Sequence, residues 1–385
     1  MSGSIVNLVS KGVQDAYLTG NPEVSFFRQK FKRHTNFAIK HSKLTYQGTW
    51  TNSGELLVKI PIKGDLLNYV WIDTSAFKPD DNDDKGIYGL SPYDGDGDVS
   101  YSLYIGGQLV DRMDGYYNGV LYPKYLLDKG SKSNNLFNAP MFDIMEVETP
   151  YNAPMVPISF SFFDACPLPL VALQYHEVEI RIKLNSNATA YKTAYGTVPE
   201  IYACYTLLDT EERDWFASNR HELLFSQVQK IPMTLGDATN PAFDLSLLNH
   251  PVKAIMFGTK KVDDVQTNLD DAYRFTDAQL YLNGTTLFDS TMPQVFFVCT
   301  QPYFHGGQFA AVSQFDGTSG LYSFALNAAK NYPTGSCNFS RLDNAMLKLT
   351  GWVGNGNTGE DAYVYAVNWN IFRVESGMGG VAFAN

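Results

Sequence analysis

The sequence predicts an all-β protein made of two tandem eight-stranded jelly-roll sandwiches, with short helices at the N-terminus, in long loops and at the domain joint. Three observations carry this prediction. Apolar and polar residues alternate in many short segments, as in strands with one buried face. Gly, Pro and Asp clusters separate these segments. Several segments of the first half recur, in the same order, in the second half.

The stretch from Val156 to Leu184 shows the alternation most clearly. Its first part predicts a strand over 156–162, in which Phe and Ile alternate with Ser. Its second part predicts a strand over 178–184, in which Val, Ile and Leu alternate with charged residues. The loop between them contains two prolines, which cannot donate hydrogen bonds to a neighbouring strand. We therefore expect two strands that each bury one face.

This stretch and others have counterparts in the second half. The matching segments are 103–107 with 280–284, 160–162 with 322–324, 176–182 with 343–349, and 201–205 with 362–366. The spacing between matching segments is far longer than a solenoid repeat, and it varies because the loops differ in length. The pattern therefore predicts two copies of one β-domain.

The predicted strands form two sets. The first set is 43–50, 55–62, 67–76, 99–105, 156–162, 178–184 and 200–208. The second set is 222–231, 242–248, 252–258, 276–283, 320–326, 342–352 and 362–374. Seven or eight short strands with long connections are typical of a jelly roll, and an immunoglobulin sandwich is the alternative. The long excursions at 112–155 and 284–320 favour the jelly roll.

Short helices are predicted at four places. The helical spacing of Ile5 and Leu8 indicates the first, and an N-cap at Asn21 followed by Pro22 indicates the second, over 22–31. The third covers 117–127, and a capping-box pattern from Asp209 begins the fourth. We place the domains at 1–42 (N-terminal segment), 43–209 (first jelly roll), 210–220 (helical joint) and 221–385 (second jelly roll).

The composition limits the possible functions. The chain has 385 residues, a net charge of −11, 14% aromatic and 18% charged residues. Many aromatics and few charges suit packed sheets and buried contacts between subunits, and the acidic balance argues against direct binding of nucleic acid. No apolar run reaches 18 residues, and we see no secretory signal. The four cysteines lack metal-site spacing and are expected to be reduced.

A basic segment near the N-terminus is the first candidate contact site. No acidic residue occurs from Val24 to Gly54, where the basic side chains include Arg28, Lys30, Lys32, Arg33, Lys40 and Lys43. This local reversal of charge is typical of a segment that meets an acidic partner or an anionic membrane surface. It is equally typical of a solvated face, or of a patch that neutralises the acidic body.

An acidic loop is the second candidate. The stretch between Phe77 and Val99 predicts an exposed loop that carries Asp80, Asp81, Asp83, Asp84, Asp94, Asp96 and Asp98. The alternate carboxylates of its last three aspartates suit a hard cation such as calcium. However, Val99 and Ile105 stand where an EF-hand has Gly and Glu. A solvated loop and a cation site therefore both stay open.

No catalytic site, metal site or cofactor is predicted. The six histidines include no His-x-His pair, and His176 and His221 are expected to be structural. The sequence also lacks a GxSxG motif, a phosphate-binding loop and a nucleotide fingerprint. We therefore expect a protein that is not an enzyme.

Motifs along the whole chain resemble those of one protein family. They are DAYLTGNP with SFFRQKFKRHTNFAI, PLPLVALQYHEVEI, LLDTEERDWFA, GSCNFSRLDNA and the final SGMGGVAFAN. Together they are similar to the major capsid proteins of the nucleocytoplasmic large DNA viruses, above all those of algal viruses. The similarity extends from about residue 14 to residue 385.

The resemblance implies a structural protein of the virion, assembled in the host cytoplasm. It implies two jelly rolls per chain and a homotrimer, the capsomer, whose nearly hexagonal outline tiles an icosahedral shell around double-stranded DNA. It places the N-terminal segment on the inner side, near minor capsid proteins and an internal membrane. A minor-capsomer paralogue and a carbohydrate-binding β-sandwich protein are the alternatives.

Overall fold

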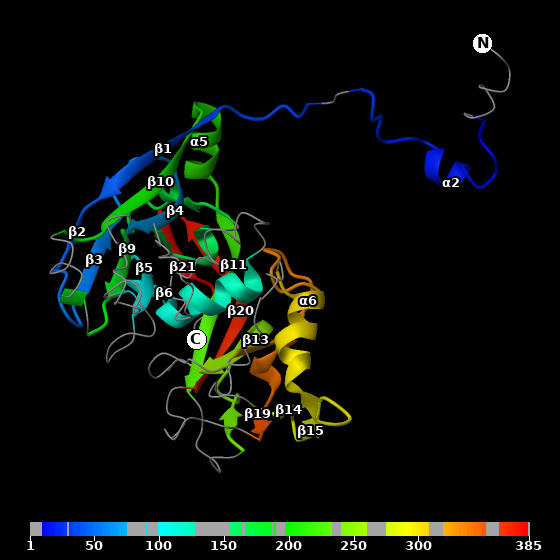
Figure 1. Cartoon of the computed structure of the whole chain (residues 1–385). Coiled ribbons are helices and arrows are strands. Elements are labelled where there is room, and N and C mark those ends of the chain that lie inside the picture. The colour runs from blue at the N-terminus through cyan, green and yellow to red at the C-terminus, as the bar shows by residue number, and fades with distance from the viewer. Residues whose placement is uncertain are drawn as a thin grey trace, which may run out of the picture. The chain divides into compact units, whose positions relative to one another are not determined.

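The computed structural model describes most of the chain (Figure 1). The described residues are 10–28, 31–74, 90, 99–127, 155–163, 166–186, 188–189, 197–232, 240–259, 275–307, 319–351 and 362–383. The chain divides into two units, residues 1–36 and residues 37–385, which are described separately below. No helix within the described ranges is long and apolar enough to cross a membrane.

The described residues of the first unit are mostly turns, bends and irregular segments. Its one described helix, α2 (Ala16–Thr19), ends at Gly20. The helix predicted over 22–31 is wrong, because residues 22–28 and 31 are not helical. Instead of capping a helix, Asn21 has a positive φ of 46°. Phe26 and Phe27 are 92% and 99% exposed, so no packing supports a helix here, and a short helix without such support is marginal in water. The helix predicted from Ile5 falls largely on residues 1–9, which are not among the described residues.

The second unit begins with two antiparallel sheets, which we call roll 1. The order of the first sheet is β1 (Phe37–Leu44), β10 (Glu200–Leu208), β4 (Leu66–Asp73) and β7 (Met155–Pro157), and β8 (Leu168–Pro169) also pairs with β4. The order of the second sheet is β2 (Tyr46–Gln47), β3 (Glu55–Lys59), β9 (Val178–Lys183), β5 (Ser100–Ile105) and β6 (Gln108–Asp114).

Two further antiparallel sheets follow, which we call roll 2. The order of the third sheet is β11 (His221–Pro232), β20 (Ala362–Glu375), β13 (Pro251–Thr259) and β17 (Ser319–Ser323); β18 (Cys337–Asn338) pairs with β13, and β21 (Met378–Val381) pairs with β20. The order of the fourth is β12 (Ala242–Asp244), β19 (Ala345–Thr350), β14 (Asp277–Leu282) and β15 (Thr285–Thr286), and β16 (Met292–Pro293) pairs with β14.

The two rolls repeat one strand order. The path β1-β10-β4-β7 corresponds to β11-β20-β13-β17, and β3-β9-β5-β6 corresponds to β12-β19-β14-β15. Even the short helices recur. The ten-residue π-helix η2 (Tyr117–Leu126) is matched by η6 (Phe296–Thr300) with α6 (Gln301–His305), and η4 (Leu170–Ala172) is matched by η7 (Phe339–Arg341). The predicted double jelly roll is confirmed.

The helix α5 (Thr210–Ser218) lies between the rolls in sequence, where the fourth helix was predicted. The side chain of Asp209 caps it by accepting a hydrogen bond from the amide of Thr210. Strand β1 begins at Phe37 and β11 begins at His221. The domain limits placed on the sequence stay a prediction.

The strand predicted over 156–162 is only partly correct. The strand β7 ends at Pro157, and the 3₁₀ helix η3 (Ser161–Phe163) follows. Phe160 and Phe162 are buried, as the alternation predicts. However, Ser161 Oγ accepts a hydrogen bond from Ser226 N of β11, so this segment leaves its own sheet and packs against roll 2. The strand predicted over 43–50 contains β2 and only the end of β1, and the short strands β6 and β21 were not predicted.

The hydrophobic core is not divided equally. One cluster of buried side chains lies within roll 2 and includes Phe243, Leu280 and Phe297. The larger cluster contains the core of roll 1 together with roll 2 side chains such as Phe225 and Tyr365. The two rolls are therefore joined by a continuous apolar layer, which we call the seam.

Candidate functional site

The predicted basic segment is divided between the two units. Arg28, Lys32 and Arg33 are exposed in the first unit, whereas Lys40 and Lys43 lie on the exposed strand β1 of the second. Lys30 is outside the described residues. The structure therefore does not bring these side chains together as one patch of a single unit.

Lys43 also has a partner of its own. Its ammonium group forms an ion pair with the carboxylate of Glu200 on β10. This hydrogen bond raises the pKa of Lys43 and, together with a second one from Tyr202, lowers the pKa of Glu200. Because both groups are exposed, such a pair contributes little to stability.

All seven aspartates of the predicted acidic loop lie outside the described residues, so they stay a prediction; Leu90, within the same stretch, is buried. Within the part of the chain that the structure describes, no three His, Cys, Asp or Glu side chains are grouped as metal ligands. His176 Nδ1 is 2.9 Å from the carbonyl oxygen of Gly379, and His221 Nε2 is 2.7 Å from that of Phe216. Both histidines thus hold the chain through backbone contacts.

The seam combines aromatic, hydrogen-bonding and ionic contacts between the two rolls. At its apolar end Phe162 of roll 1 stacks on Phe225 of roll 2, with ring centroids 4.7 Å apart. Phe162 also meets Phe372 edge to face at 5.5 Å. All three side chains are buried. Aromatic pairs in these geometries add to the stabilisation from burial itself.

A buried carboxylate holds the polar part of the seam. Asp114, at the end of β6, accepts hydrogen bonds from the hydroxyl of Tyr365 at 2.6 Å and from the amide of Tyr117 at 2.8 Å. The ammonium group of Lys230 on β11 lies 2.8 Å from the same carboxylate. The charge of Asp114 is therefore compensated from both rolls.

A second carboxylate covers the edge of β11. Asp111 Oδ1 accepts hydrogen bonds from the amides of Val228, at 3.2 Å, and Arg112, at 2.9 Å. Burial raises the pKa of Asp111 to about 7, although these two hydrogen bonds oppose the shift. With Ser161 bonded to Ser226 N, roll 1 supplies acceptors for two amides on this strand edge.

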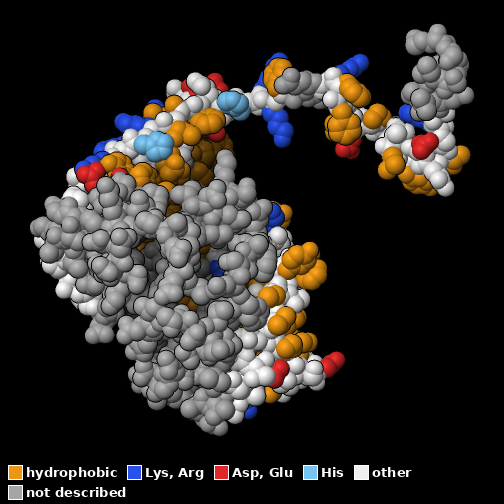
Figure 2. All heavy atoms as spheres, in the orientation of Figure 1, with side chains coloured by type: hydrophobic (Ala, Val, Ile, Leu, Met, Phe, Trp, Pro, Cys, Tyr) orange, Lys and Arg blue, Asp and Glu red, His pale blue; other side chains and the backbone are white. Residues whose placement is uncertain are grey.

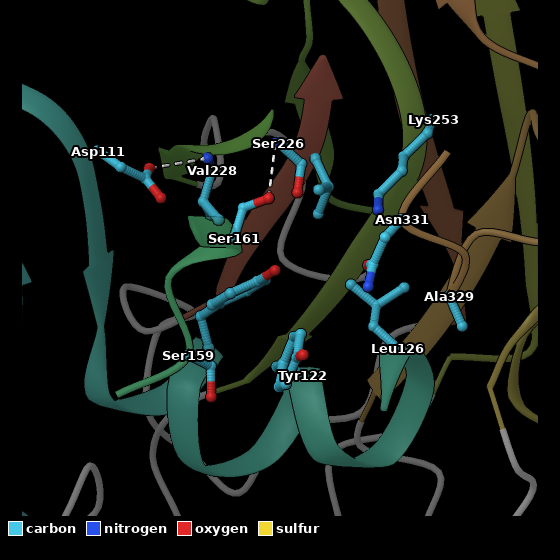
Figure 3. Close-up of a pocket in the computed structure, with 12 residues that line it drawn as sticks. Asp111, Tyr122, Leu126, Ser159, Ser161, Ser226, Val228, Lys253, Ala329 and Asn331 are labelled. Carbon is cyan, nitrogen blue, oxygen red and sulfur yellow. Dashed lines mark hydrogen bonds between the residues drawn. The ribbon is translucent and has the colours of Figure 1, made fainter. Parts of the chain in front are cut away.

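A small cavity lies in the seam beside Asp111 (Figure 3). Ser159, Ser161 and Ser226 line it on one side, and Tyr122, Lys253 and Asn331 on the other. It offers a water-sized sphere about 20 Å³ of space, which suits about one ordered water molecule between polar groups. The cavity is therefore part of the joint between the two rolls.

The surface of the second unit carries two groups of apolar side chains. The first lies on the outer face of the β1–β10–β4 sheet and includes Ile39, Tyr69 and Trp71, of which Trp71 stacks on Tyr202 at 4.9 Å. The second follows α6, where Tyr303, Phe304 and Leu326 are exposed. Figure 2 shows apolar side chains along the edge where Figure 1 places α6. Exposed apolar groups of this kind mark contact surfaces.

The sequence reasoning missed the seam and both apolar surfaces. One signal was available for part of the seam. Gly106-Gly107 after a predicted strand is typical of a two-residue hairpin turn, and a hairpin would have placed Asp111 and Asp114 on a strand. Nothing local to β6 indicated that β11 lies against it.

Comparisons with known proteins agree with one another. The family model described as "Major capsid protein N-terminus" matches residues 25–211, and the model described as "Large eukaryotic DNA virus major capsid protein" matches residues 212–380. The major capsid protein of Pyramimonas orientalis virus is 32% identical, and that of Paramecium bursaria Chlorella virus 1 is 29% identical. Both comparisons cover all of this chain and all of the relative.

Solved structures show the same likeness. A quasi-atomic model of the PBCV-1 virus capsid matches with a TM-score of 0.73 and 27% identity, covering 94% of this chain and 100% of that chain. The Faustovirus major capsid protein matches with a TM-score of 0.62 and 11% identity, covering 95% of each chain. At that identity the second comparison speaks for the fold alone.

Proposed function

The chain belongs to the major capsid proteins of the large eukaryotic DNA viruses and is a component of the virion capsid, and from this premise we propose that three copies form one capsomer. Each copy contributes two jelly rolls, so the capsomer has six similar corners and a nearly hexagonal outline. Such capsomers tile the facets of an icosahedral shell. The role proposed is structural and not catalytic.

One observation carries this proposal: a single chain holds the same strand order twice, locked together by a buried seam. Two similar rolls per chain let a threefold assembly imitate sixfold packing. The imitation requires a fixed angle between the rolls. Phe162 against Phe225, and Asp114 against Tyr365 and Lys230, would hold that angle, since interiors packed this closely resist deformation.

A permanent trimer needs large interfaces. Threefold closure uses one heterologous contact three times, and a permanent contact is expected to bury more than about 2,000 Å². The exposed apolar side chains on the β1–β10–β4 face and along α6 could supply part of that area.

Light scattering on the purified chain, combined with electron microscopy, tests the proposal. We expect a mass of three chains, particles with a hexagonal outline and, at high concentration, hexagonal arrays. A stable monomer at micromolar concentration would contradict it. The copy number per virion separates a major capsomer from a minor paralogue. A glycan array and a chelator titration test the carbohydrate-binding alternative, which predicts hits that depend on calcium.

We propose further that the first unit meets partners on the inner side of the shell. Phe26 and Phe27 are almost fully exposed beside Arg28, and Phe31 is exposed beside Lys32 and Arg33. Adjacent aromatic and basic side chains suit anionic membrane surfaces and acidic proteins. The partners proposed are minor capsid proteins and the internal viral membrane, met during assembly in the host cytoplasm.

Vesicle flotation with the full-length chain tests the membrane contact. We expect it to float with vesicles that contain phosphatidylserine and not with phosphatidylcholine alone. The double variant Phe26→Ser and Phe27→Ser should lose this binding, whereas Tyr17→Ser, an equally exposed change outside the basic segment, should keep it. Absence of flotation with either vesicle type would remove the membrane from the proposal and leave the minor capsid proteins, whereas equal flotation with both would remove the role of the basic side chains.

A further inference from the structure

The seam joins two different surfaces, one from each roll. Roll 1 contributes its helical edge, made of β6 and η2, where Asp111, Lys124 and Tyr125 make contacts. Roll 2 contributes its sheet face, the outer side of β11, β20, β13 and β17. There Tyr365, Val367 and Met256 belong to the cluster that contains the roll 1 core. Because each roll has the same strand order, each also has a counterpart of the surface that the other uses.

The helical edge of roll 2 is exposed. Its η6–α6 pair spans ten residues, as η2 does, and Pro302 stands where η2 has Pro123. Tyr303 and Phe304 then correspond to Lys124 and Tyr125 of the seam. They are 69% and 67% exposed, although their counterparts in roll 1 touch roll 2.

The neighbouring hairpin agrees with this correspondence. Leu103 pairs with Asp111 in roll 1, and in roll 2 the matching residue, Leu280, accepts a hydrogen bond from the amide of Leu287. Leu287 therefore takes the place of Asp111. It is an exposed apolar side chain where roll 1 has a buried carboxylate.

The sheet face of roll 1 is also open. Across its sheet the row His41–Cys204–Tyr69 corresponds to the row Lys230–Tyr365–Met256 of roll 2. Tyr69 is 41% exposed, whereas Met256, its counterpart, is fully buried in the seam. Roll 1 thus keeps an outer face of the kind that the chain covers in roll 2.

The two open surfaces lie at opposite sides of the second unit: β1 and β10 at one side, and α6 at the other (Figure 1). One molecule cannot join them. We propose that the contact between copies repeats the seam, with the helical edge of roll 2 of one copy seated on the sheet face of roll 1 of the next. This inference rests on the proposed trimer and names its interface. Such a contact is heterologous and closes into a ring.

The correspondence identifies a specific pair. Within the chain Tyr125 Oη lies 2.9 Å from Ser319 Oγ. In roll 2 a row of paired residues runs across three strands, from Ser319 to Gly258 to Tyr363. The corresponding row in roll 1 runs from Pro157 to Trp71 to Tyr202. Pro157 is therefore the counterpart of Ser319. In the assembly Phe304 of one copy should lie against Pro157 and Trp71 of the next.

Cross-linking tests this pair. The chain with Pro157→Cys and Phe304→Cys is treated with a short bismaleimide, and the products are separated on a denaturing gel. We expect the yield of linked dimers and trimers to be at least about tenfold higher than in the native protein and in each single variant. Those three samples show how much cross-linking the four native cysteines cause. Leu247→Cys with Pro157→Cys is the matched control, because Leu247 is exposed in the turn after β12, outside both surfaces.

A charge placed in the contact gives a second measurement. Phe304→Asp should lower the fraction of trimer at least about tenfold by light scattering, and Leu247→Asp should leave it unchanged. Circular dichroism of the Phe304→Asp chain should still show a folded protein. Trimers that form without the Pro157–Phe304 link, or that survive Phe304→Asp, would overturn the inferred contact and leave the trimer standing. Absence of trimers in the native protein would overturn the proposed function itself.

Discussion

Equivalent positions in the two rolls have different neighbours. Tyr365 lies in β20, is fully buried and donates a hydrogen bond to Asp114 across the seam. Cys204, at the equivalent place in β10, lies in a sheet whose outer face is open at Tyr69 and His41. The strand order is the same, so the difference reflects what covers each sheet. After a domain is duplicated, the surface residues of each roll change according to the partner that the roll contacts.

The edge strands show the same contrast. In roll 2 the amides of Ser226 and Val228 on β11 are bonded by Ser161 and Asp111 of roll 1. The counterpart of β11 is β1, which among the described strands pairs with β10 alone and carries the exposed Lys40. Lysine on an edge strand discourages unspecific strand pairing. One edge is thus closed by its own chain, and the other is protected by charge.

Removing a seam aromatic tests whether the rolls are one folding unit. Phe162→Ala should lower the free energy of unfolding by about 4 kcal/mol, since it deletes a buried ring that contacts Phe225 and Phe372. Denaturant unfolding of the second unit, followed by tryptophan fluorescence and circular dichroism, should shift as a single transition. Phe26→Ala, in the exposed first unit, should leave the midpoint unchanged. Two separate transitions in the native protein would show that the seam does not couple the rolls.

Asp114→Ala should produce the next largest effect. It removes the carboxylate that accepts the hydrogen bond of Tyr365 and pairs with the ammonium group of Lys230, and breaking such a buried pair costs about 3 kcal/mol. The melting temperature in thermal unfolding measures this loss of stability. Glu177→Ala is the matched control, because Glu177 pairs with Lys59 on the surface of roll 1 and should leave the melting temperature unchanged. Equal effects of the two changes would mean that the seam charges are solvated.

The other seam carboxylate, Asp111, gives a smaller effect, which depends on pH. Burial raises the pKa of Asp111 to about 7 in the folded protein, from an unfolded value near 4. The folded state therefore binds this proton more tightly, and the contribution to stability falls as pH rises from about 4 to 7. Between pH 5 and 7 the loss is about 2 kcal/mol.

Asp111→Asn keeps an acceptor for Val228 N and removes the titration. The unfolding free energy of this variant should fall less than that of the native protein over the same pH range. Tyr117 and Lys253 line the same cavity as Asp111. Tyr117→Phe is the control, because it alters this cavity but keeps the carboxyl group of Asp111, and it should keep the native pH dependence. A variant with the native slope would assign the slope to another group.

The sequence predicted the architecture because it depends on local patterns. Alternation in 178–184 and 362–374 located β9 and β20, and the matched segments revealed the duplication. The seam depends on which strands of the two rolls lie against each other, and the alternation of apolar and polar residues within a strand does not determine this. Phe162 was correctly expected to be buried, yet its partner Phe225 is 63 residues away. Asp111 and Asp114 look like ordinary charged residues until β11 is placed against them.

The errors near the N-terminus have a different cause. Asn21, Pro22 and Glu23 are good helix-starting residues, but local preference is weak without a surface to pack on. Phe26 and Phe27 find none within the first unit. In the same way, the basic segment is continuous in sequence, but Phe37 begins a strand that assigns Lys40 and Lys43 to another unit.

The smallest expected effect concerns two hairpin turns that should behave alike. Gly107 after β5 has φ of 80°, and Gly284 after β14 has φ of 76°, with open space around both. Ala at either position costs about 1 kcal/mol, because a side chain disfavours the left-handed region. Gly107→Ala and Gly284→Ala should therefore lower the melting temperature equally.

Substitutions at the residue before each turn glycine should lower the melting temperature by different amounts in the two rolls. A Cβ on Gly106 would come within 2.6 Å of the His176 ring, whereas its counterpart, Asn283, accepts hydrogen bonds from the amides of Asp343 and Asn344 through its side chain. Gly106→Asn should thus destabilise the protein more than Gly107→Ala, since the ring that it displaces also contacts Gly379 of β21. Asn283→Gly should cost only its two hydrogen bonds. Equal effects of Gly106→Asn and Asn283→Gly on the melting temperature would show that His176 moves freely and that the two turns are interchangeable.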